Sequence, residues 1–454
     1  MSKTETAVPE HSSACVTARA NATHKPLIPV LTYFKELTMH KNIRFTALTA
    51  LLVLITVAGA QSKKVVFLSG QNEDVGYTRI ISELARDYQK QHPNVSYEYQ
   101  NNTTDMTQKL QLLAGSNNLP TLYSIGEPSL LQQLYAKGEI VDLEQTFKKL
   151  GIYNQLNPVA VDINKKLEGG KLLGLPLELN IEGVWYNKKV FADNGIREPK
   201  TWDEMLSAAE KFKQKGIQPF SASGDQGWPL TRLLGGYAER YYGADAMDRV
   251  KAGTLKLTDP GFVQAAATVQ DMGKKGYFGQ GVNTVDYDTA VDAFLQGKAA
   301  MFYMGSWELR NFNDPKRNQI GAGNIGFFNL PAVKGGKGTM SDWSINTGLV
   351  VAMNQKQNDA ALGEWMKYVF SNYGTRSMSE LGALTGFKVS KMPATVPALT
   401  TMTQRKLNSA KKGYLWFEGY FSPKATSLSQ KNVQLLVTGD MTPEDFLGQL
   451  QNGK

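Results

Sequence analysis

The feature that most constrains the fold is a regular alternation of strand-like and helix-like segments early in the chain. Buried-strand patterns at 64–70, 94–100 and 120–126 are each followed by apolar residues at helical spacing. This alternation predicts an α/β fold in which a parallel sheet carries helices on both faces. Ligands of such sheets bind beyond the carboxyl ends of the strands. Here those ends are the polar, glycine-bearing segments 69–76 and 124–129.

The chain is too long for one small core. It has 454 residues, 42% hydrophobic and 20% charged, which predicts a globular protein of two lobes or domains. The second lobe contains an alternating strand pattern at 175–186. Leucines and isoleucine occupy one face of this strand, and Glu178, Asn180 and Glu182 occupy the other. The polar face is directed either at solvent or at a ligand, and the pattern alone leaves both open.

A secretory signal peptide is predicted at residues 39–60. Lys41 and Arg44 form a positive start, a short apolar stretch follows, and the sequence AGA at 58–60 provides a cleavage pattern. The apolar stretch is too short for a comfortable membrane span, although an uncleaved anchor stays an alternative. Residues 1–38 are polar and aperiodic, so we expect a disordered upstream extension whose translation is left open.

Removal of the signal peptide limits the available chemistry. The exported part has no cysteine, so it has neither disulfides nor an attachment point for a bacterial lipid anchor, and we expect a free periplasmic protein. Its single histidine, His92, lies in polar helix-end sequence, which argues against a Cys–His catalytic pair and against a zinc site. We expect no cofactor, because the glycine-rich segment 333–339 lacks the spacing of a phosphate-binding loop.

Net charge excludes another class of partner. The formal charge of +9 is spread over the chain without a cluster of lysines or arginines, so we expect no nucleic-acid partner. A glycosidase needs only two carboxylates, so a carboxylate-dependent glycosidase or lyase stays an alternative.

A tryptophan stands at an unusual place in the segment 300–312, AMFYMGSWELRNF. A buried strand breaks at Gly305-Ser306, and Trp307 follows directly, before a helical stretch. An isolated tryptophan after an apolar run is usually part of a core. At the mouth of a strand-to-helix turn it can instead face a cleft and contact a ligand.

Several segments in order carry a family resemblance. They are LPTLYSIGE, GGKLLGLPLELNIEGVWYNKKVF, PKTWDEMLSAAEKFKQKGI, GDQGWP, FLQGKAAMFYMGSWELRNF and IGFFNLPAVKGGKG. Together they resemble the extracellular solute-binding proteins of carbohydrate ABC transporters, and are similar to the maltose-binding and multiple-sugar-binding class. The resemblance runs from about residue 62 to the C-terminus.

The resemblance implies a hinged, two-lobe periplasmic-binding-protein fold with three crossings between lobes. The N-lobe would comprise 61–172 and 346–386, and the C-lobe 173–345 and 387–454. Such a protein is a monomer that closes around a mono- or oligosaccharide and delivers it to the membrane permease subunits of an ABC importer, without catalysis. A same-fold binder of a non-sugar solute and a chemoreceptor-linked sugar sensor remain alternatives.

The resemblance also implies a ligand site made of aromatic platforms and hydrogen-bonding side chains. No catalytic residue and no metal ligand is expected. Trp185, Trp202 and Trp365 fall on apolar faces and are predicted to be core. The candidate ligand-binding residues are Gln71, Glu127, Asn180, Glu182, Trp228, Trp307, Asp342, Trp343 and Trp416.

Overall fold

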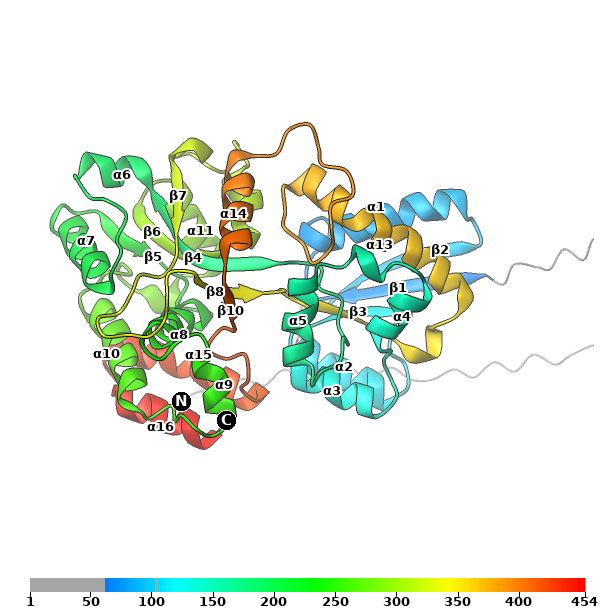
Figure 1. The fold of residues 1–454 in the computed structure, drawn as a ribbon, viewed down its shortest axis with the longest axis horizontal. Coiled ribbons are helices and arrows are strands. Elements are labelled where there is room, and N and C mark those ends of the chain that lie inside the picture. Colours follow the sequence, from blue (N-terminus) through cyan, green and yellow to red (C-terminus); the bar gives the residue numbers. More distant parts are fainter. Residues whose placement is uncertain (1–61, 103–104, 454) are drawn as a thin grey trace, which may run out of the picture. The chain divides into compact units, whose positions relative to one another are not determined.

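The computed structural model describes residues 62–102 and 105–453, and its strands form two sheets (Figure 1). The predicted signal peptide at 39–60 and the extension at 1–38 lie outside the described residues. The first sheet has the order β2-β1-β3-β9. Its strands are β1 (Lys63–Ser69), β2 (Val95–Asn101), β3 (Leu122–Ile125) and β9 (Val350–Met353).

The first sheet follows the sequence prediction in its first three strands. β1 pairs in parallel with β2 and with β3, whereas β9 joins the edge antiparallel to β3. The helices that accompany this sheet include α1 and α13, which are far apart in sequence and pack against each other (Figure 1). They are α1 (Gly76–Gln91), α2 (Met106–Gly115), α3 (Pro128–Ala136), α4 (Leu143–Lys149), α5 (Pro158–Leu167) and α13 (Ala360–Leu381).

The second sheet has the order β10-β8-β4-β6-β5, with β7 also paired to β4. The central strand β4 is antiparallel to β6, β7 and β8. The strands are β4 (Asn180–Asn187), β5 (Gln218–Ser221), β6 (Ala299–Gly305), β7 (Ile325–Phe328), β8 (Asp342–Asn346) and β10 (Lys412–Tyr414).

Of the helices that follow β4 and accompany the second sheet, α6, α7, α11 and α15 begin with a side-chain cap. Thr201 accepts a hydrogen bond from the backbone N–H of Glu204 at 3.1 Å, which confirms the capping signal in the sequence. The helices are α6 (Lys188–Asp193), α7 (Trp202–Gln214), α8 (Trp228–Tyr242), α9 (Ala246–Lys251), α10 (Pro260–Lys274), α11 (Tyr287–Leu295), α12 (Leu309–Phe312), α14 (Ala398–Ser409), α15 (Pro423–Thr438) and α16 (Pro443–Gly453). Short 3-10 turns occur at Tyr153–Gln155, Val282–Thr284, Ser306–Glu308, Ala322–Asn324 and Gln355–Gln357.

Both sheets are covered on both faces. Consecutive strand residues point to opposite faces, and in β1 Phe67 and Leu68 join two different hydrophobic clusters. In β4 the same holds for Val184 and Trp185. The α/β fold with helix-flanked sheets is therefore confirmed. Trp185, Trp202 and Trp365 are buried, as the sequence predicts, and His92 caps the C-terminal end of α1.

The chain passes from one sheet to the other over short segments. Leu175 still bridges to Val351 of the first sheet, and β4 of the second sheet begins at Asn180. Residues 347–349 alone separate β8 in the second sheet from β9 in the first. The lobe boundaries given above stay a prediction.

Candidate functional site

Trp307 lies where β6 ends, in the turn that the sequence indicated. The 3-10 turn Ser306–Glu308 follows the strand directly and leads into α12. Gly305 has no side chain, and a Cβ atom there would collide with the Trp307 ring. The six-membered ring of the indole therefore lies directly against the Gly305 backbone. The Ser306 hydroxyl fixes the turn to β4, because it donates to Asn180 Oδ1 at 3.1 Å and accepts from the Ile181 N–H at 3.2 Å.

The outer edge of Trp307 is held by a tyrosine. Trp307 Nε1 donates to the Tyr287 hydroxyl at 2.7 Å, and that hydroxyl donates to the Glu308 carboxylate. Glu308 also accepts from Asn311 at 2.6 Å. A ring with its N–H engaged in this way keeps one orientation, which is a property that a stacking platform requires.

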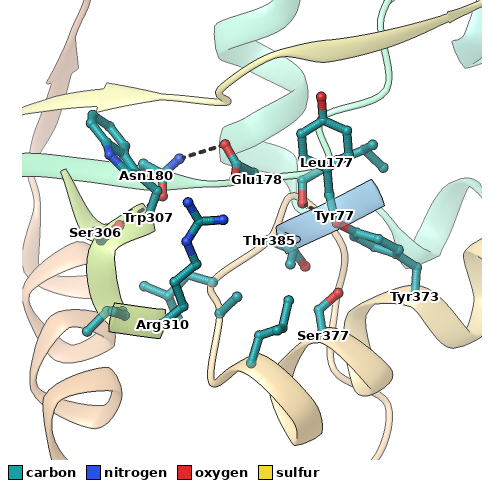
Figure 2. A pocket seen from close by; sticks show the side chains of 15 residues that line it. Tyr77, Leu177, Glu178, Asn180, Ser306, Trp307, Arg310, Tyr373, Ser377 and Thr385 are labelled. Carbon is teal, nitrogen blue, oxygen red and sulfur yellow. Dashed lines mark hydrogen bonds between the residues drawn. The ribbon is translucent and has the colours of Figure 1, made fainter. Parts of the chain in front are cut away.

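Trp307 lines a small enclosed space that we call the inner pocket, of about 30 Å³. Figure 2 shows Trp307, Asn180 and Arg310 on one side of it and Tyr77 and Tyr373 on the other. The full lining is Gly76, Tyr77, Leu177, Glu178, Asn180, Ser306, Trp307, Leu309, Arg310, Tyr373, Ser377, Leu381, Ala383, Leu384 and Thr385. It brings α1 and α13 of the first sheet's helices together with β4 and the Trp307 turn.

Glu178 is the acidic group of the inner pocket. Its carboxylate accepts a hydrogen bond from Asn180 Nδ2 at 3.3 Å (Figure 2). Burial raises the pKa of Glu178 to about 7, and the charge of Arg310 and the Asn180 hydrogen bond limit that rise. The carboxylate also lies against Gly348, where an added Cβ would collide with Glu178 Oε2.

A larger opening, which we call the tryptophan cavity, has a volume of about 460 Å³. Trp228 begins α8, and Trp416 lies in the segment before α15. Glu127 enters from the other sheet's elements, where it precedes α3. The lining is completed by Asp105, Thr107, Gly126, Pro128, Ser129, Arg232, Glu418, Gly419, Phe421, Pro423, Thr426, Ser427 and Gln430. The volume lies in the range of small-molecule sites.

Trp307 of the inner pocket contacts Trp228 of the tryptophan cavity. Its ring is edge-on to Trp228, with centroids 5.9 Å apart and an interplanar angle of 61°. The Arg232 guanidinium carbon lies 4.5 Å from the ring centroid of Trp228, 5.4 Å from Trp416 and 5.9 Å from Trp307. Three of the seven tryptophans thus surround one guanidinium, and none of these three rings is fully buried.

Glu182 anchors this arrangement from the sheet. Its Oε1 pairs with Arg232 Nη1 at 2.8 Å and accepts from Asn346 Nδ2 at 2.6 Å, while its Oε2 accepts from the Tyr303 hydroxyl at 3.0 Å. Asn180 is 2% and Glu182 1% exposed, so the polar face of β4 is not a solvent face. The solvent alternative left open by the sequence is wrong, because this face is a buried hydrogen-bonded network.

The structure gathers most of the predicted site residues but not all of them. Glu127, Trp228 and Trp416 line the tryptophan cavity, and Asn180 and Trp307 line the inner pocket. Glu182 lies behind them. The Gln71 side chain lies near the pocket's edge, because its Oε1 is 4.0 Å from where a Gly76 Cβ would lie.

Asp342 and Trp343 lie apart from both spaces. Trp343 is 4% exposed and packs against Phe327, with ring centroids 5.5 Å apart. Asp342 Oδ2 accepts from the Thr339 N–H at 2.7 Å, so it closes a local turn. Both side chains are occupied within the second sheet and its loops, and we do not include them in the site.

Sequence reasoning missed Arg232, Glu418 and Arg310, and it placed Glu178 on the polar face of the strand at 175–186 without naming it as a site residue. Arg232 follows Trp228 by four residues, and residues at this spacing lie on the same face of a helix. That spacing was a usable signal. No such signal was available for Glu418. It lies two residues after Trp416 in a largely aromatic run that shows neither helical nor strand periodicity, so its orientation could not be predicted.

Other site classes find no support in the part of the chain that the structure describes. Within residues 62–102 and 105–453, no group of three or more His, Cys, Asp or Glu side chains could hold a metal ion. Over the same residues, no helix is both long and apolar enough to cross a membrane.

Comparisons with known proteins place this geometry in a family. The chain is 30% identical over 183 residues to a multiple sugar-binding protein from Streptococcus mutans, which covers 37% of this chain and 40% of that protein. It is 26% identical over 297 residues to the sn-glycerol-3-phosphate-binding periplasmic protein of Escherichia coli, covering 62% and 66%. The chain thus matches less than two thirds of the length of these curated relatives.

A solved structure supports the fold over nearly its whole length. A chitin oligosaccharide binding protein superimposes with a TM-score of 0.76 at 24% identity, covering 86% of this chain and 98% of that one. The resemblance to a two-lobe solute-binding fold is therefore confirmed. The model of the bacterial extracellular solute-binding protein family matches residues 73–375, about two thirds of the sequence. The chain belongs to the bacterial extracellular solute-binding proteins.

Proposed function

We propose that this chain binds a mono- or oligosaccharide in the tryptophan cavity, which Trp228 and Trp416 line and Trp307 approaches through its contact with Trp228, and delivers it to the permease of an ABC importer. The observation that carries the proposal is the grouping of three incompletely buried indoles with buried acidic and amide side chains. Sugars present apolar C–H faces, which stack on aromatic rings, and hydroxyls, which pair with carboxylates and amides. Two of the similar proteins are named for sugars.

The proposed ligand contacts differ by position. Trp228, Trp307 and Trp416 would serve as stacking platforms, and Glu127, Asn180 and Gln71 would meet hydroxyls. Glu182 acts from behind, since Arg232, Tyr303 and Asn346 already occupy its oxygens. The site works without a chemical step, so the bound sugar would be released unchanged.

The proposal includes export to the periplasm. The signal pattern at 39–60 supports it, and the family is extracellular. Mass spectrometry of the protein recovered from the periplasm would give Gln61 as its first residue. Recovery of a membrane-bound, uncleaved chain would contradict this part of the proposal.

The test is a ligand panel on unfolded and refolded residues 61–454, which carry no retained ligand. Chitin, xylan and raffinose-type oligosaccharides are scored by thermal shift and by tryptophan fluorescence. A ligand that binds only the native state raises the melting temperature. Recovery of the sugar unaltered would exclude a glycosidase, whereas a shortened product would favour one. Failure of every saccharide to shift either signal would refute sugar binding.

One relative gives a reason to include a phosphate ester in the panel. The Escherichia coli protein is named for sn-glycerol 3-phosphate. An anionic ligand needs a basic side chain whose charge is not already balanced by carboxylates. Arg232 is the basic residue among the described lining residues of the tryptophan cavity, so its charge balance bears on whether such a ligand can bind there.

A further inference from the structure

Arg232 occupies the space between three indoles without acting as a free positive charge. Its guanidinium lies within 6 Å of the ring centroids of Trp228, Trp307 and Trp416, which is the range of cation–π attraction. The side chain is 18% exposed. A charge buried to this degree needs a partner.

Two carboxylates supply the partner charge. Glu182 pairs with Arg232 Nη1 at 2.8 Å, and its own side chain is fully buried. Glu418 lines the tryptophan cavity and is 5% exposed. Burial by itself would lower the pKa of Arg232, but the charges of Glu182 and Glu418 raise it overall. Glu182 alone balances the guanidinium, so the balance holds whichever protonation state Glu418 adopts.

Both Arg232 and Glu418 keep one unused hydrogen-bonding atom. Arg232 Nε and Glu418 Oε2 are buried and have no hydrogen-bond partner among the described residues. The other Glu418 oxygen accepts from the Thr231 hydroxyl. A buried donor or acceptor without a partner costs free energy, so a ligand that satisfies both atoms gains that free energy on binding. A sugar hydroxyl both donates and accepts.

We propose that Arg232 and Glu418 determine the ligand class: together they bind the hydroxyl groups of an uncharged saccharide, and their compensated charges exclude phosphate esters and carboxylates. This rests on the proposed function and adds to it two specificity-determining residues.

The remaining charges of the cleft act in the same direction. Asp105 and Glu127 also line the tryptophan cavity, and among its described lining residues Arg232 is the one basic side chain. In the inner pocket, Arg310 lies in electrostatic range of Glu178, as does Glu308. An anion added to the tryptophan cavity would therefore meet acidic groups and no unbalanced cation among the described lining residues, and this repulsion opposes its binding there.

The test measures calorimetric affinity for two kinds of probe. The neutral probes are chitotriose, xylotriose and raffinose, and the anionic probes are sn-glycerol 3-phosphate and glucuronate. The variants are Glu418→Gln, Arg232→Met and Arg232→Lys. Glu239→Gln is the matched control, because Glu239 is a buried carboxylate on the same helix as Arg232 and outside the cavity. Circular dichroism and a thermal melt first establish that each variant is folded, and affinities are compared only among folded variants.

We expect the wild type to bind a neutral probe and to show no detectable affinity for either anion. Arg232→Met and Glu418→Gln should each weaken neutral binding by about 10-fold or more, the range for a hydrogen bond to a charged group. Arg232→Lys keeps the charge but loses Nε, and should weaken neutral binding too. Glu239→Gln should match the wild type.

Two outcomes would overturn the assignment while leaving sugar binding intact. One is a wild type that binds glycerol 3-phosphate or glucuronate as tightly as a neutral sugar. The other is a set of folded Arg232 and Glu418 variants with unchanged affinity and preference. A wild type that binds no neutral probe defeats the proposed function itself, and is thereby distinguishable from both.

Discussion

The indole N–H of Trp307 donates to the hydroxyl of Tyr287 at 2.7 Å, and this contact fixes a ring that lines the inner pocket and packs edge-on to Trp228 of the tryptophan cavity. Tyr287 comes from α11, whereas Trp307 follows β6, so two elements converge to orient one ring. Tyr287 in turn pairs with Glu308. The position of Trp307 therefore depends on a residue that does not line either space.

Replacement of Tyr287 should weaken ligand binding although the Tyr287 side chain lines neither space. Tyr287→Phe removes the acceptor for Trp307 Nε1, so the ring gains freedom that binding must remove, and we expect affinity to fall by roughly 3- to 10-fold, the cost of one hydrogen bond. Tyr242→Phe is the control, since its hydroxyl accepts from the Gly261 N–H at 2.8 Å, away from the site. Calorimetry with the sugar found in the panel provides the measurement. Equal losses for the two variants would contradict a positioning role.

Two tryptophans that the sequence assigned to the site should behave differently. Trp416→Ala removes a cavity wall beside Arg232, and we expect a loss of about 10- to 100-fold in sugar affinity, as for a stacked aromatic ring. Trp343→Phe alters a core contact with Phe327, so the melting temperature should fall while affinity stays unchanged. If the Trp343 variant folds like the wild type without ligand but binds the sugar more weakly, Trp343 belongs to the binding site after all.

Gly348 should tolerate no side chain. Its φ is +62°, and an added Cβ would collide with Glu178 Oε2, so Gly348→Ala should lower the free energy of unfolding by about 1–3 kcal/mol. Gly138→Ala is a matched control, because Gly138 also has a positive φ, +72°, but open space around its Cβ position. Urea denaturation of both variants separates the collision from the backbone effect. Equal destabilisation in the two would show that the Glu178 contact contributes nothing.

Glu168 should make stability depend on pH. Its carboxylate accepts from the N–H groups of Leu173 and Gly174 at 2.5 and 3.2 Å, yet burial raises its pKa from 4.5 to about 8. Between those two values the folded state binds more protons than the unfolded state. The free energy of unfolding therefore falls as pH rises through this window, and levels off above it.

A glutamine at position 168 cannot ionise and keeps an acceptor for the same N–H groups. The stability of Glu168→Gln relative to the wild type should thus increase as pH rises from about 5 to about 9. Burial also raises the pKa of Glu178. In the Glu168→Gln variant the free energy of unfolding should therefore still fall as pH rises, but by less than in the wild type. Chemical denaturation at several pH values provides the measurement, with exposed Glu364→Gln as control. Parallel pH profiles for wild type and Glu168→Gln would refute the assignment.

The parts of the fold that depend on short-range pattern could be predicted from the sequence. The alternation of strands and helices around β1, β2 and β3 indicates a sheet that is buried on both faces. The pair Thr201 and Glu204 indicates the start of a helix. The antiparallel edge strand β9 could not be predicted in this way. It lies over 200 residues after β3 in the chain, and no local pattern records which strand it pairs with.

A site residue could be predicted only where its own type and its immediate neighbours in the sequence indicate a binding role. Trp307 is identifiable because a large aromatic residue follows a glycine-serine turn. Arg232 looks like an ordinary helical arginine, and its meaning comes from Glu182 on β4 and from Trp416 beyond α14, which the fold alone brings together. Trp343 shows the converse, since an acid beside a tryptophan looks like a site in sequence while its ring packs inside the sheet's core.

The segment 347–349 limits how the two sheets can move. Three residues span at most about 10 Å even when fully extended, and their ends are fixed in hydrogen-bonded strands. The sheets therefore cannot be pulled apart or slid past one another at this joint, and the relative motion left to them there is a swivel. Under the proposed function, a ligand would enter and leave by a change of angle between the sheets, and residues far from the joint would travel the longest arc.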